Sequence, residues 1–126
     1  MWCACTANSS RDTGLRLTYF VNGIYQSWTD NLALLRPLVE RGQIQLANHT
    51  WSHPDLTKVS KTLVAQEISR NDRFLKNTFG VDARPYFRPP YGRHNPVVDA
   101  VAADLGYDTR RLPFMTTDES KLKVKT

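Results

Sequence analysis

Residues 48–54 read Asn-His-Thr-Trp-Ser-His-Pro, and the interpretation of the chain starts from them. The sequence has only three histidines, and two of them, His49 and His53, stand here four residues apart. This spacing is a common way to place two imidazoles on one metal ion. Because Pro54 disfavours an α conformation at His53, we expect a turn rather than the middle of a helix. The spacing alone also allows two surface or capping histidines.

Short strands are predicted on both sides of this turn. Polar and apolar side chains alternate over 44–47, directly before it, which indicates a strand. A β-rich run spans 15–21, and Asn-Gly ends it. Further short strands are expected at 83–87 and from Tyr107 onward.

Three helices are predicted between these strands. The first starts at Asp30 or Asn31 and runs to Arg41, with Pro37 distorting or restarting it. The longest covers 61–79, with Ser60 as its N-cap and Gly80 as its stop. Its apolar stripe is formed by Val64, Ile68, Leu75 and Phe79.

The third helix begins at Asn95-Pro96, a strong start signal, and stops at Gly106. Its inward-packing residues are expected to be Val97, Val98, Val101, Ala102 and Leu105. The resulting order is β-α-β-α-β-α-β, which is typical of an α/β fold with a parallel sheet and helices outside. In such folds the functional loops follow the strands, as the histidine turn does here.

Length and composition indicate one globular domain. The chain has 126 residues, 40% of them apolar, and a formal charge of +5 from 17 basic and 12 acidic residues. The basic residues are scattered, so we interpret the charge as a solvated surface and expect no nucleic-acid partner. No segment approaches the length of a membrane span. Cys3 and Cys5 are too close in sequence for an unstrained mutual disulfide.

Three ordered motifs carry a resemblance to a known family. His-Thr-x-x-His-Pro at 49–54 is followed by Arg-Pro-Pro-Tyr-Gly at 88–92 and preceded by Leu-Thr-Tyr-Phe-Val-Asn-Gly at 17–23. Together they resemble the NodB-homology polysaccharide deacetylases of carbohydrate esterase family 4. The resemblance covers residues 13–108 and implies a partial, irregular (β/α) barrel with parallel strands and outer helices. Residues 1–12 are expected to be irregular, and 109–126 to form an irregular basic tail.

The resemblance also implies site residues. His49 and His53 match the metal ligands, which hold Zn²⁺ or another divalent ion together with a carboxylate. Arg88 matches the arginine that orients the catalytic carboxylate, although a surface ion pair is the ordinary role of an arginine. Tyr91 matches the residue whose backbone N–H stabilises the oxyanion, and Pro90 and Tyr91 are expected to contact substrate. The implied reaction removes N-acetyl groups from a polysaccharide such as peptidoglycan or a chitin-like glycan.

Other motifs of the family are missing. No Asp-Asp pair occurs, although the family takes its general base and third metal ligand from one, and no histidine follows His94. The chain therefore looks truncated at both ends relative to the family, and we expect little or no activity from it. The alternative is an inactive glycan-binding remnant or a fragment of a longer deacetylase.

Few features of the sequence bear on the oligomeric state or the localisation. We expect a monomer. Residues 1–5 lack the basic start and apolar run of a signal peptide. Because relatives act mostly at the cell envelope, the sequence leaves the localisation open.

Overall fold

The computed structural model describes residue 8, residues 11–14 and residues 16–109. Cys3, Cys5 and the basic tail after Thr109 lie outside these residues. Residues 11–13 are helical, and the first two of them belong to the segment that the sequence predicts to be irregular. In the described part of the chain, no helix is both long and apolar enough to cross a membrane.

The centre of the fold is a pair of parallel strands. β1 (Leu17–Val21) pairs with β2 (Ile44–Asn48) in register from Leu17 opposite Ile44 to Val21 opposite Asn48. Two isolated parallel bridges, Asn48 with Phe87 and Tyr86 with Asp108, continue the sheet in chain order. Consecutive parallel segments of this kind are the beginning of a (β/α) barrel.

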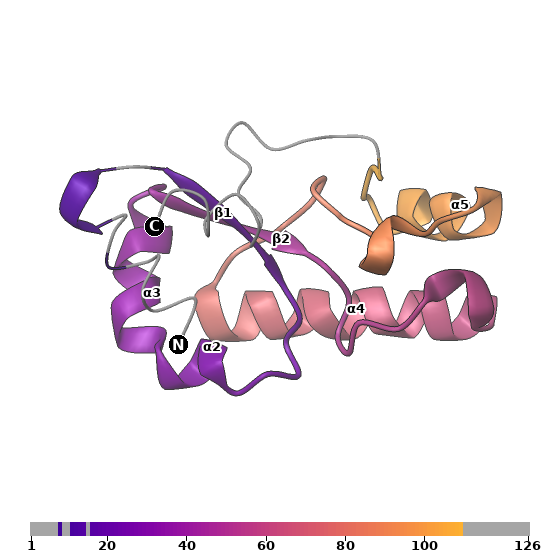
Figure 1. The fold of residues 1–126 in the computed structure, drawn as a ribbon, viewed down its shortest axis with the longest axis horizontal. Helices are drawn as coiled ribbons and strands as arrows, with labels where there is room; N and C mark the ends of the chain where they lie inside the picture. Colours follow the sequence, from indigo (N-terminus) through magenta and orange to yellow (C-terminus); the bar gives the residue numbers. More distant parts are fainter. Residues whose placement is uncertain (1–7, 9–10, 15, 110–126) are drawn as a thin grey trace.

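Helices connect the parallel segments and cover them. α2 (Ser27–Asp30) and α3 (Leu32–Glu40) link the strands, and α3 packs against β2. α4 (Lys61–Phe79) runs beneath the strands along the long axis of the molecule, and α5 (Pro96–Asp104) packs against α4 (Figure 1). Two short 3₁₀ turns, η1 (Leu56–Lys58) and η2 (Pro90–Gly92), lie in the loops.

The helix signals in the sequence act as predicted at α4 and α5. The Ser60 side chain accepts from the N–H of Leu63, and Gly80 ends α4 in the left-handed conformation with φ 70°. All four predicted stripe residues of α4 are buried. At α5 the Asn95 side chain accepts from the N–H of Val98.

One helix prediction needs correction, and one helix was not predicted. Val97 was expected to pack inward but is 52% exposed, because the buried side of α5 is formed by Val98, Val101 and Ala102. The helix predicted from Asp30 or Asn31 to Arg41 is confirmed as α3, whose N-cap is Asn31 and whose C-cap is Arg41; the four-residue α2 before it was not predicted. Pro37 lies inside α3 without ending it.

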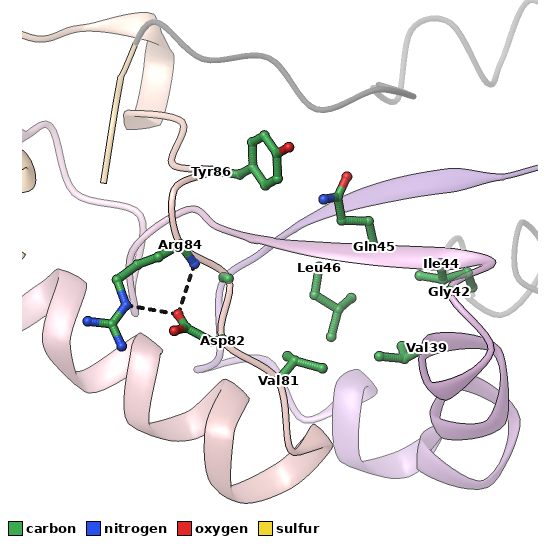
Figure 2. Close-up of a pocket in the computed structure, with 10 residues that line it drawn as sticks. Val39, Gly42, Ile44, Gln45, Leu46, Val81, Asp82, Arg84 and Tyr86 are labelled. Atoms are coloured by element: carbon green, nitrogen blue, oxygen red, sulfur yellow. Dashed lines mark hydrogen bonds and ion pairs between the residues drawn. The ribbon is translucent and has the colours of Figure 1, made fainter. Parts of the chain in front are cut away.

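The strand predicted at 83–87 is reduced to the two bridging residues Tyr86 and Phe87. Asp82 accepts hydrogen bonds from the backbone and side chain of Arg84, and the N–H of Tyr86 returns to the carbonyl of Ala83. These bonds form a turn, and Pro85 has no N–H to donate to a ladder. A groove of about 240 Å³ lies between this turn and the first half of β2, and Leu46 and Val81 are among the residues that line it (Figure 2).

Candidate functional site

The histidine loop starts where β2 ends. His49 directly follows the strand, and its N–H donates to the carbonyl of Val21 at the end of β1 (3.1 Å). Thr50 and His53 both have left-handed backbones, with φ of 73° and 63°. These two residues fold the loop back, and the imidazoles of His49 and His53 meet edge to face with centroids 4.7 Å apart. The predicted turn is therefore present, and it brings the two histidines together.

His49 is fixed in one protonation state. Its Nδ1 lies 2.6 Å from the carbonyl oxygen of Arg88, and because a carbonyl only accepts, Nδ1 carries the proton. Burial lowers the pKa of His49 from 6.5 to about 4; the hydrogen bond to Arg88 opposes this, and the nearby charges of His53 and Arg88 add to it. The ring is neutral at pH 7, with the Nε2 lone pair free. This is the form in which imidazole binds a metal.

The Arg-Pro-Pro-Tyr-Gly loop lies against the histidine loop. Tyr91 is held at φ 61°, and its ring packs edge to face on His53 with centroids 4.6 Å apart. Tyr91 as a whole is 67% exposed, whereas Pro90 is buried. An ion pair between Arg93 and Asp55 (3.0 Å) ties the two loops together further along the chain. Tyr91 is thus placed beside His53 and remains largely open to solvent.

The Arg88 side chain is exposed, and its guanidinium carbon lies 5.2 Å from the ring centre of Phe20. Within the part of the chain that the structure describes, none of the ion pairs involves Arg88. The surface ion pair that is the ordinary role of an arginine is therefore absent among these residues. Arg88 contributes to the site through its backbone carbonyl, which holds His49.

The residues between the histidines support the loop. The Thr50 hydroxyl accepts from the N–H of His53 (3.2 Å), and Ser52 donates to the carboxylate of Glu67 (2.5 Å). Trp51 packs edge to face on Phe74, with ring centroids 5.8 Å apart. The two hydroxyls bond to backbone and carboxylate groups rather than to the imidazoles.

The buried polar residues that surround the loop were not predicted from the sequence. Asn22 donates to the carbonyls of His49 and Thr50 (2.7 and 3.0 Å), and Asn48 accepts from the N–H of Thr50 (2.9 Å). Glu67 and Asn71 are buried on α4. A signal for these last two existed: they lie at helical spacing within the apolar stripe of α4, where a polar residue needs a partner.

The histidine pair fits two positions of a metal site. Two imidazoles in contact, with the His49 ring oriented by the hydrogen bond at its Nδ1, are suitable ligands for a divalent ion. Among the described residues, however, no group of three His, Cys, Asp or Glu side chains converges. The described residues thus provide two ligands, and a complete site needs another donor.

Comparisons with known proteins identify the family and fold that this chain resembles. A sequence model of the polysaccharide deacetylase family matches residues 6–110. Chitin deacetylase 1 of Cryptococcus neoformans var. grubii is 32% identical over 100 residues, covering 76% of this chain and 20% of that protein. A probable peptidoglycan-N-acetylglucosamine deacetylase of Arthroderma benhamiae is 29% identical, covering 83% of this chain and 24% of that protein.

Solved structures show a similarity to the same class of enzymes. A family 4 carbohydrate esterase from Streptomyces lividans, solved in complex with acetate, superposes with a TM-score of 0.68 and 35% identity. The match covers 80% of this chain and 50% of that chain. The parallel strands and outer helices described above are therefore part of a NodB-type (β/α) barrel. The chain spans about a third or less of the curated relatives that it matches.

Proposed function

The chain belongs to the polysaccharide deacetylase family, and we propose that it carries the two-histidine half of a metal-dependent deacetylase site. The substrate is an N-acetylated polysaccharide such as peptidoglycan or a chitin-like glycan, as the names of the relatives suggest. One observation carries the proposal: His49 and His53 lie in ring contact, and His49 is held neutral with Nε2 free.

His49 and His53 would hold Zn²⁺ or another divalent ion. When bound, such an ion supplies Lewis acidity, polarising the acetamide carbonyl and lowering the pKa of a coordinated water. The residues of this chain contribute orientation. The Arg88 carbonyl fixes the His49 ring, and the left-handed Thr50 turns the loop so that His53 reaches it.

The Arg-Pro-Pro-Tyr-Gly loop at 88–92 has residues suited to contact the substrate. The exposed Tyr91 ring beside His53 offers an apolar face to a sugar, and Pro90 holds the loop rigid from beneath. The backbone N–H of Tyr91 is the proposed donor to the oxyanion, a contribution of about 3 kcal/mol in such sites. The Arg88 guanidinium is available to orient a carboxylate.

We further propose that this chain alone has little or no deacetylase activity. The chemistry needs a third ligand and a general base, and the described residues bring neither to the histidine pair. The same observation favours the second candidate function, a catalytically inactive module that binds N-acetylated glycan. The two candidates share the binding step and differ in whether acetate is released.

Glycan binding and acetate release test these proposals together. Isothermal titration with chito-oligosaccharide and with its fully deacetylated counterpart should show a preference for the acetylated form, weakened by Tyr91→Ala. Equal binding of both forms would contradict the proposed substrate class. Metal-dependent release of acetate that His49→Ala abolishes would refute the proposed inactivity and establish a working deacetylase.

A further inference from the structure

The buried side of α4 carries two polar residues, Glu67 and Asn71, one turn apart. Glu67 contacts the histidine loop through Ser52. Asn71 has no exposed surface, and its hydrogen bonds go to Val21, Gly23 and Asn48. Because an unpaired buried amide is costly, the partners of Asn71 show what its position in the core stabilises.

Asn71 bonds to the carboxyl ends of both strands. Its Nδ2 donates to the carbonyl of Val21 (2.7 Å) and to Oδ1 of Asn48 (2.9 Å), and its Oδ1 accepts from the N–H of Gly23 (2.8 Å). Val21 ends β1 and Asn48 ends β2. The three bonds therefore fix the two strand ends relative to α4.

Asn48 in turn forms hydrogen bonds to the histidine loop and to the loop that contains Arg88. Its Oδ1 also accepts from the N–H of Thr50 (2.9 Å), and its Nδ2 donates to the carbonyl of Ile68 and to the hydroxyl of Tyr107 (3.0 and 3.2 Å). Its backbone carbonyl accepts from the N–H of Arg88 (3.0 Å). Asn48 thus holds the peptide between the two histidines, and also the residue whose carbonyl orients His49.

We infer that Asn71 is the positioning residue for the His49–His53 pair, acting through Asn48 and Thr50. Its donors keep the Asn48 amide turned so that Oδ1 faces Thr50, and this contact holds Thr50 in its left-handed conformation. The two rings stay in contact because Thr50 is held there. The relevance of this contact to metal binding rests on the proposed function, whereas the positioning itself does not.

The test replaces Asn71 by aspartate, which has the same shape but cannot donate to Val21 or Asn48. Asn77→Asp is the matched control, because Asn77 is an exposed asparagine on the same helix. Leu75→Ala controls for a general loss of stability. Without metal, hydrogen exchange of the Thr50 amide should accelerate about tenfold in Asn71→Asp relative to the amide of Val101. Neither control should change this ratio.

Two further readouts follow the rings themselves. NMR contacts between the rings of His49 and His53 should weaken in Asn71→Asp and persist in both controls. Zn²⁺ affinity, measured by chelator competition, should fall about 10–100-fold, as for residues that orient metal ligands. If Asn71→Asp does not fold, Asn71→Ser serves instead. The serine side chain is too short to make the hydrogen bonds to Val21 and Asn48, and it adds no buried charge.

The outcomes separate this inference from the proposed function. Thr50 exchange and ring contacts in Asn71→Asp that equal those in Asn77→Asp would overturn the positioning role, even if Zn²⁺ binds. Altered exchange and ring contacts in a chain that binds no Zn²⁺ would support the positioning role and contradict the metal site instead.

Discussion

His49 should make the folding stability of this chain depend on pH in a specific window. Burial lowers its pKa from 6.5 to about 4, so the folded chain keeps the ring neutral while the unfolded chain binds a proton below pH 6.5. The unfolded state therefore binds more protons, and stability falls as the pH falls. This contribution is fully present above pH 6.5 and is lost progressively toward pH 4.

The size of the effect follows from the two pKa values. One proton gives a slope of at most about 1.4 kcal/mol per pH unit. Integrating the difference in bound protons between the unfolded and folded states from pH 7 to pH 5 gives a loss of about 2 kcal/mol in the free energy of unfolding. Because the His49 ring is partly exposed, this figure is an upper limit.

Urea unfolding at pH 7 and pH 5, followed by tryptophan fluorescence with a chelator present, measures this difference. Wild type should lose about 2 kcal/mol between the two pH values, and His49→Gln, which cannot take up the proton, should lose much less. His94→Gln keeps the His49 ring and should retain the wild-type dependence. An equal loss in wild type and His49→Gln would refute the claim that His49 is held neutral by its surroundings.

Three substitutions test the packing that supports the site, each by urea unfolding. Gly23→Ala should destabilise by about 1–3 kcal/mol, because its Cβ would come within 2.7–2.8 Å of three side chains; a neutral effect would show that the loop yields easily. Leu75→Ala should cost about 2–5 kcal/mol as a cavity in the core, and a loss below 1 kcal/mol would contradict its full burial. Asn95→Ala should cost about 1 kcal/mol by removing the hydrogen bond to the N–H of Val98, and an unchanged midpoint would argue against this cap.

The elements with strong local signals were predictable from the sequence. α4 has a side-chain N-cap, an apolar stripe at helical spacing and a terminal glycine, and these signals agree with one another. The strand predicted at 44–47 from alternation alone is confirmed as β2 (Ile44–Asn48). The strand expected at 83–87 failed because its composition favoured β structure while Asp82 and Pro85 formed a turn. That competition depends on a side-chain hydrogen bond that alternation does not detect.

The site was predictable to a similar extent. His49 and His53 could be named from their spacing and the following proline, and the structure brings them together. The carbonyl of Arg88 as the partner of His49 could not be named, because any residue type carries a carbonyl. Asn48 and Asn71 were missed for a related reason: their importance comes from burial, and an asparagine in sequence more often indicates a turn.

A titration of the purified chain with Zn²⁺ tests the central claim most directly, with His49→Ala and His53→Ala measured alongside and His94→Ala as the matched control. We expect one Zn²⁺ ion per chain. The affinity should be lost in His49→Ala and in His53→Ala and retained in His94→Ala. Binding that is absent, or that survives both substitutions, would contradict the assignment of His49 and His53 as metal ligands.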